Sequence, residues 1–173
     1  MSMIAPVQPA EAPTGAVPGS GWLSGSIQAL HDQGRWGWLR ENREQLPVAV
    51  DELIRFVSPV MHFRRTATQD TELQGQHIRA GDKVVMWYSA ANRDPAVFAD
   101  PHSLDLTRNP NPRLAFGVGP HICLGSHLAK LEMRVMLDDM LSRFSSVEVT
   151  GDVERMGSNF INGIHHLPVR VAA

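Results

Sequence analysis

Apolar residues recur at helical spacing in three segments, and each segment predicts helical structure. In residues 26–42 two glycines interrupt the pattern, so we expect two short helices there. In residues 47–57 a proline stands where the first turn of a helix tolerates it, and the apolar positions that follow face one side. The third helix is expected to run from residue 124 to residue 144. Its apolar face consists of Leu124, Leu128, Leu131, Val135 and Met136.

Two stretches between these helices have other patterns. Residues 83–88 (KVVMWY) are mostly apolar and lack the alternation of a half-buried strand, so we expect a central strand that is covered on both faces. Residues 92–116 contain four prolines and no sustained period, which predicts a long connection without regular structure. Compact domains keep such connections mainly when they have a function. Helices combined with short strands predict an α+β fold with small mixed β-sheets.

The first 23 residues differ in composition from the rest of the chain. They contain four prolines, a density that blocks both helix and sheet hydrogen bonding, so we expect residues 1–23 to be disordered or loosely attached. Residues 24–173 are then expected to form one globular domain. Of all 173 residues, 43% are hydrophobic and 20% are charged, which is close to ordinary globular proportions.

Charge and cysteine content argue against several classes of function. A net charge of -2, with 16 basic residues spread along the chain, gives no electrostatic footprint for nucleic acid or an anionic membrane surface. The sequence has no apolar stretch long enough for a membrane span and no signal-peptide pattern, so we expect a cytoplasmic protein. A single cysteine excludes an internal disulfide and any multi-cysteine metal cage.

The strongest chemical signal is the segment FGVGPHICLG, residues 116–125, immediately before the third predicted helix. Its glycines permit a tight backbone, and the start of a helix supplies partial positive charge and free N–H groups beside the Cys123 sulfur. These features favour a thiolate, which serves as a nucleophile or as a metal ligand. Spacing alone leaves both uses open, together with a small buried Cys123 and with a thiol enzyme that uses His127, one helical turn away.

The same segment resembles the haem-ligand loop of the cytochrome P450 superfamily, in the pattern Phe-Gly-x-Gly-x-His-x-Cys-x-Gly. The resemblance implies that Cys123 is the thiolate ligand of the haem iron and that Phe116 packs near it. It also implies that His121, Arg113 and Arg65 bind the haem propionates, with Arg64 as an equally basic alternative to Arg65. Many relatives have histidine at the position of Arg113. The residues that the resemblance assigns to haem binding are Arg65, Arg113, Phe116, His121, Cys123 and Gly125.

Other parts of the chain are similar to the same family. Glu52 and Arg55 resemble its Glu-x-x-Arg pair, which lies on a helix and binds an arginine upstream of the haem loop, and Arg108 matches that arginine. The resemblance implies a structural anchor, whereas an i, i+3 pair elsewhere is more often a weak, solvated salt bridge. It also implies that apolar residues of two segments contact substrate. These residues are Val60, Met61, Phe160 and Ile161.

The resemblance implies a haem b monooxygenase that inserts one oxygen atom from O2 into a lipophilic small molecule, such as a terpenoid, a sterol or a fatty acyl chain. Electrons would come from NAD(P)H through a ferredoxin and a ferredoxin reductase. Only the carboxy-terminal part of the family is matched, so residues 24–173 would be a partial, mainly helical P450 domain without the distal helix and its acid-alcohol pair. The alternatives are a non-catalytic haem-binding remnant and one half of a split assembly.

Overall fold

The computed structural model describes residues 21–173. Residues 1–20 of the segment that we expect to be loosely attached lie outside the described residues. Helix α1, Gly21–Asp32, begins before the expected domain boundary at residue 24. Trp22 and Leu23 pack against the hydrophobic core, so the folded part of the chain reaches back at least to Gly21.

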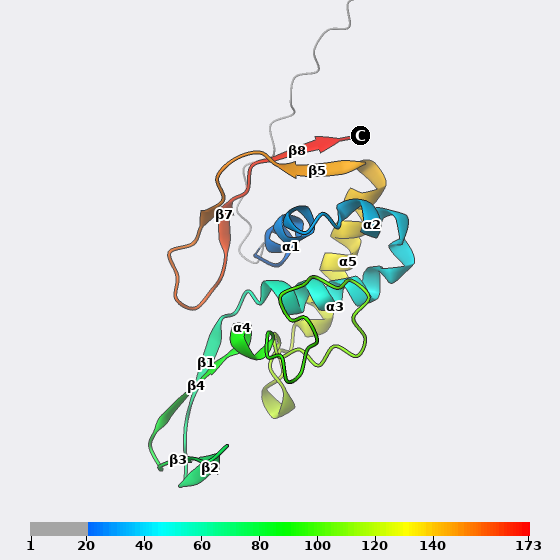
Figure 1. The fold of residues 1–173 in the computed structure, drawn as a ribbon. Helices are drawn as coiled ribbons and strands as arrows, with labels where there is room; N and C mark the ends of the chain where they lie inside the picture. Colours follow the sequence, from blue (N-terminus) through cyan, green and yellow to red (C-terminus); the bar gives the residue numbers. More distant parts are fainter. Residues whose placement is uncertain (1–20) are drawn as a thin grey trace, which may run out of the picture.

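Helices supply most of the hydrophobic core (Figure 1), with α1 and α5 packed against α3. The two short helices expected over residues 26–42 are confirmed as α1 and α2. Gly34 lies between them with a left-handed φ of +60°, which interrupts the helical backbone. None of the helices formed by residues 21–173 combines the length and hydrophobicity that crossing a bilayer requires. In chain order the helical elements are α1, α2 (Trp36–Glu41), the 3-10 turn η1 (Arg43–Gln45), α3 (Leu46–Val57), α4 (Tyr88–Ala91), the 3-10 turn η2 (Gly119–His121) and α5 (Ser126–Arg143).

Within residues 21–173 the strands form antiparallel pairs, where small mixed sheets were expected. The β1–β4 ribbon leads away from the helices towards the β2–β3 hairpin, whereas the β5–β8 pair lies near α1 and α2 (Figure 1). Helices with small sheets confirm the α+β fold class. The pairs are β1 (His62–Thr66) with β4 (Lys83–Trp87), β2 (Thr71–Leu73) with β3 (Gln76–Ile78), β5 (Ser146–Val149) with β8 (Val169–Ala172), and β6 (Glu154–Arg155) with β7 (Ile164–His166).

The prediction of a central strand covered on both faces is wrong for residues 83–88. Among the described residues, β4 pairs only with β1, and the side chains of Val85, Met86 and Trp87 are 37% to 53% exposed. The apolar run has a different physical reason, because Met86 and Trp87 form one wall of a hollow beside the Cys123 loop. A wall of this kind needs apolar side chains but no second covering layer.

Helix α5 confirms the third predicted helix, but the predicted apolar face is not the buried one. Met133, Leu137 and Leu141 are buried against the core, whereas Leu128 and Leu131 are at least half exposed. The helix is apolar on two opposite sides, and periodicity alone gives no rule for which side faces the core. The exposed stripe of α5 consists of Leu128, Leu131, Val135 and Met136, whereas the exposed Leu124 precedes the helix.

The expected long connection is confirmed, since no helix or strand occurs between Asn92 and Val118. This loop, drawn in green in Figure 1, lies across α3. Phe98, Leu104 and Leu106 are buried, so part of the loop is integrated into the domain although it has no regular structure.

Candidate functional site

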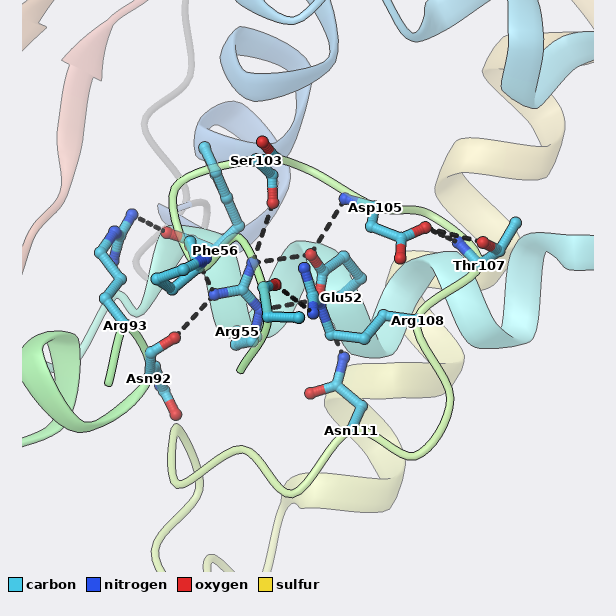
Figure 2. A network of polar contacts seen from close by, with 12 residues as sticks. Glu52, Arg55, Phe56, Asn92, Arg93, Ser103, Asp105, Thr107, Arg108 and Asn111 are labelled. Atoms are coloured by element: carbon cyan, nitrogen blue, oxygen red, sulfur yellow. Dashed lines mark hydrogen bonds and ion pairs between the residues drawn. The ribbon is translucent and has the colours of Figure 1, made fainter. Parts of the chain in front are cut away.

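A buried ion pair on α3 organises its surroundings (Figure 2). Glu52 and Arg55 have fully buried side chains. Arg55 donates from Nε to Glu52 Oε2 and from Nη2 to Glu52 Oε1, each over 2.7 Å. Arg108 donates from Nε to Glu52 Oε2 over 3.2 Å. The structure therefore brings together the three residues that the sequence assigns to an anchor.

The loop of residues 92–116 is fastened to this anchor through its main chain. Arg55 Nη1 donates to the carbonyl oxygens of Asn92, over 2.6 Å, and Pro101, over 2.9 Å. Its Nη2 also lies 3.2 Å from the carbonyl oxygen of Ser103. A buried guanidinium must satisfy its N–H groups, so the fold requires these carbonyls around α3.

A buried asparagine links the anchor to the segment before Cys123. Asn92 is fully buried. Its Nδ2 donates to Ser58 Oγ over 2.8 Å, and its Oδ1 accepts the Leu114 N–H over 2.7 Å. Ser58 follows α3, and Leu114 leads into the Cys123 loop. One side chain therefore fixes the distance between the end of α3 and this loop.

Cys123 lies in a closed loop between η2 and α5, and its thiol is free and exposed. Its N–H donates to the Phe116 carbonyl over 2.9 Å, and its own carbonyl accepts the Ser126 N–H over 3.2 Å. Gly117 adopts a φ of +73°, which favours glycine because a Cβ is strained there. His127 is exposed, and no hydrogen bond within residues 21–173 joins it to Cys123.

A hollow of about 370 Å³ lies between the β1–β4 ribbon and the Cys123 loop. Arg65 on β1 and His121 on η2 both line it, so the structure brings these two predicted propionate ligands together. The other walls combine apolar side chains with the glycine of the loop. They are formed by Met86, Trp87, Tyr88, Ala91, Leu114, Gly117 and Val118.

Arg113 is not part of this lining. Its Nη2 donates to Asp51 Oδ1 on α3 over 2.7 Å, and its guanidinium carbon lies 6.0 Å from the centroid of the Phe116 ring. Burial lowers the pKa of Arg113, and the negative charge of Asp51 opposes that shift. Arg113 is thus joined to α3 and does not line the hollow that Arg65 and His121 share.

The four predicted substrate residues lie on two segments that meet. Val60 and Ile161 form an isolated antiparallel bridge, and the Met61 N–H donates to the Phe160 carbonyl over 2.9 Å. The Phe160 ring packs edge-on against Phe63, with centroids 5.4 Å apart. The two segments therefore form one surface that is partly aromatic and partly exposed.

Comparison with known proteins adds the family. The family model of cytochrome P450 matches residues 39–166, which is well over half of the chain. The chain belongs to the cytochrome P450 family. This P450 chain is 52% identical over 124 residues to a methyl-branched lipid omega-hydroxylase of Mycobacterium tuberculosis, a match that covers 71% of the chain and 29% of the relative. It is 43% identical over 148 residues to linalool 8-monooxygenase of Pseudomonas putida, covering 85% of the chain and 36% of the relative.

A solved structure supports the same assignment of the fold. Cytochrome P450-153 from Novosphingobium aromaticivorans superposes with a TM-score of 0.82 at 42% identity, over 87% of this P450 chain and 38% of the other chain. The family and fold predicted from the sequence are therefore confirmed. The P450 chain spans about a third of the length of the curated relatives that it matches.

Sequence reasoning missed several residues of the P450 site. Asp51 and Lys130 form an ion pair over 3.0 Å beside Arg113, and Asn111 donates to Glu52 over 3.0 Å. No local sequence pattern marks Asp51 as part of the site, because its partners Arg113 and Lys130 lie far away in the sequence. The role of the buried Asn92 could have been predicted from the sequence, since a polar side chain that begins a long loop often satisfies backbone groups of that loop.

Proposed function

We propose that this chain is the haem-thiolate part of a cytochrome P450 monooxygenase. The Cys123 loop carries the proposal. Its thiol is exposed and free, and its backbone is closed by hydrogen bonds on both sides of the cysteine. The same loop contributes Gly117, Val118 and His121 to the hollow that Arg65 also lines.

The side chains present fit a haem group. A cysteine thiolate is a suitable ligand for haem iron. Arg65 and His121 offer hydrogen-bond donors of the kind that bind carboxylates such as the haem propionates. Trp87 and Leu114 give the hollow apolar walls that suit a porphyrin. Arg113 pairs with Asp51 and does not line this hollow, so its binding of a propionate stays a prediction, and its contact with Asp51 is taken up below.

Bound haem b would supply the activation of O2, in which one oxygen atom enters the substrate and the other becomes water. The residues of the chain bind and orient the group. Cys123 Sγ would hold the iron, and the hydrogen bond from the Cys123 N–H to the Phe116 carbonyl keeps the loop in shape for it. Phe116 and Gly125 flank the cysteine, where the phenyl ring would limit access of water to the sulfur.

The substrate is assigned to the lipophilic class. Val60, Met61, Phe160 and Ile161 would contact it, because they form one partly exposed apolar surface. Relatives named for a methyl-branched lipid, linalool and a steroid support this class without deciding among them. Electrons would come from NAD(P)H through a ferredoxin and its reductase. We place this chemistry in the cytoplasm, where an exposed thiol stays reduced.

A reduced carbon-monoxide difference spectrum of the purified chain with added haem tests the proposal. We expect a strongly red-shifted Soret band for the wild-type chain. Cys123→Ser should lose that shift, and His127→Ala is the matched control that should keep it, since its side chain is exposed and unpaired with Cys123. A shifted band that survives Cys123→Ser refutes the ligand assignment. A wild-type chain that takes up no haem, or shows only an unshifted band, refutes the proposal for this chain acting alone.

One half of a split assembly is a second candidate, favoured by the exposed stripe of α5. Leu128 is 59% exposed and Leu131 is 50% exposed, and apolar surface of this kind marks interaction sites. The occupant would be the remaining part of a P450 domain, which accounts for about two thirds of the relatives' length. Adding that part of linalool 8-monooxygenase as a separate chain should then produce haem binding. Leu131→Lys should abolish the effect, and its persistence would exclude the stripe as the contact.

A further inference from the structure

A single carboxylate oxygen on α3 binds one cation from each flank of the Cys123 loop. Asp51 Oδ1 lies 2.7 Å from Arg113 Nη2 and 3.0 Å from Lys130 Nζ. Arg113 precedes the loop, and Lys130 follows it on α5. The side chains of all three residues are less than a third exposed, so solvent screens these charges less than it screens a surface pair.

The upstream contact leads to the backbone of the cysteine. The Arg113 guanidinium faces the Phe116 ring. The same ring also packs against Trp22, with ring centroids 5.1 Å apart. The carbonyl of Phe116 accepts the N–H of Cys123 over 2.9 Å. A shift of Arg113 would therefore move Phe116 and, with it, the acceptor of the Cys123 hydrogen bond.

The downstream contact holds the first turns of α5. The Ser126 N–H donates to the Cys123 carbonyl over 3.2 Å, and the Ala129 N–H donates to the Gly125 carbonyl over 2.9 Å. Lys130 follows directly in the same helix. Because a helix moves as a stiff unit, fixing Lys130 to α3 also fixes the point at which α5 begins after Cys123.

Arg113 depends on Asp51 for its position. The Arg113 side chain is 13% exposed, and its Nε atom is buried without a hydrogen-bond partner among the described residues. The bond from Nη2 to Asp51 is thus the polar contact that justifies burial of this cation. Without the carboxylate, the guanidinium gains by turning towards water and leaving the Phe116 ring.

We propose that Asp51 clamps the Cys123 loop by holding both of its flanks to α3, and that it is a positioning residue for the thiolate. The consequence at haem rests on the proposed function. The clamp itself is a property of the chain without haem, so the two can fail independently.

Amide hydrogen exchange of the haem-free chain tests the clamp. Asp51→Asn keeps the shape of the side chain and removes its charge, and the amides of Cys123 and Ser126 should then exchange about tenfold faster, as expected when a charge-assisted bond no longer opposes local opening. Asp138→Asn is the matched control, because Asp138 also ties α5 to an arginine before α3 but pairs with Arg43 away from the loop. It should leave both amides unchanged.

Spectra of the haem-loaded chain give a second measurement. Asp51→Asn should lower the fraction of the red-shifted carbon-monoxide band, and Asp51→Glu should restore part of it because the negative charge returns. Arg113→Gln breaks the same pair from the other side and should repeat the exchange result if Asp51→Asn fails to fold. Unchanged exchange at Cys123 in both variants, or equal loosening by Asp138→Asn, overturns the clamp. A wild-type chain without the shifted band overturns the function and leaves the exchange test valid.

Discussion

Replacing Arg55 with methionine should strongly destabilise the domain. The substitution keeps an unbranched side chain of similar length and removes the charge together with five hydrogen bonds. Two of these bonds go to Glu52, and three go to main-chain carbonyls of the loop over α3. The variant would therefore leave a buried carboxylate and buried carbonyl groups without their main donor.

The structure sets the size of the expected loss. Removing one partner of a buried ion pair costs about 3 to 5 kcal/mol, because the remaining charge stays buried. Glu52 retains three other donors, namely the Asp105 N–H, Arg108 and Asn111, which places the loss near the lower end of that range. A domain with a total stability of about 5 to 15 kcal/mol would lose a substantial fraction of it.

Urea unfolding followed by far-ultraviolet circular dichroism measures this loss. Arg43→Met is the matched control, because the Arg43–Asp138 pair is 41% and 52% exposed and such surface pairs contribute only about 0 to 1 kcal/mol. We expect a clearly lower midpoint for Arg55→Met and almost none of that shift for Arg43→Met. Equal midpoints for the two variants would refute the reasoning that burial of the Glu52–Arg55 pair is what makes it essential.

Three further outcomes are expected from the same unfolding assay. Asn92→Leu leaves buried groups on both sides of the asparagine unpaired and should cost about 1 to 3 kcal/mol, so an unchanged midpoint would contradict the link it forms. Gly117→Ala should cost about 1 to 2 kcal/mol, because φ is +73° and the added methyl stands 3.4 Å from the Tyr88 hydroxyl; Tyr88→Phe should relieve little of this cost if the dihedral dominates. Burial raises the pKa of Asp105, but bonds from Thr107 and nearby arginines outweigh it and leave the pKa below its ordinary value. Because the pKa of Asp105 is lower in the folded state, its contribution to the free energy of unfolding is present above the unfolded pKa and is lost as pH falls through the folded pKa. Thr107→Val should weaken this loss of stability at low pH, and a pH profile of stability identical to that of the wild type would refute the role of the Thr107 bonds.

Features that depend on local chemistry could be predicted from the sequence. Pro47 marked the start of α3, Gly34 separated α1 from α2, and the glycine pattern around Cys123 identified the loop before α5. In each case a few neighbouring residues determine the backbone conformation. The α+β fold and the family follow from these signals together.

Features that depend on distant partners could not be predicted. Both sides of α5 are apolar, so only the packed structure distinguishes buried Leu137 from exposed Leu128. The contact between Arg113 and Asp51 could not be predicted either, because a cation before the Cys123 loop is as suitable for binding a haem propionate as for pairing with Asp51. Which partner it takes depends on the three-dimensional distance to α3, and no local pattern encodes that distance.

The way in which Arg55 holds the loop also determines where this sequence is free to change. The guanidinium contacts main-chain carbonyls, and every amino acid carries a carbonyl. Exposed loop positions such as Val97 and His102 can therefore accept many replacements without loosening the attachment, whereas Arg55 accepts almost none. Selection or laboratory evolution could diversify the outer surface of this loop, including any face that it offers to a partner, while the domain beneath it stays the same.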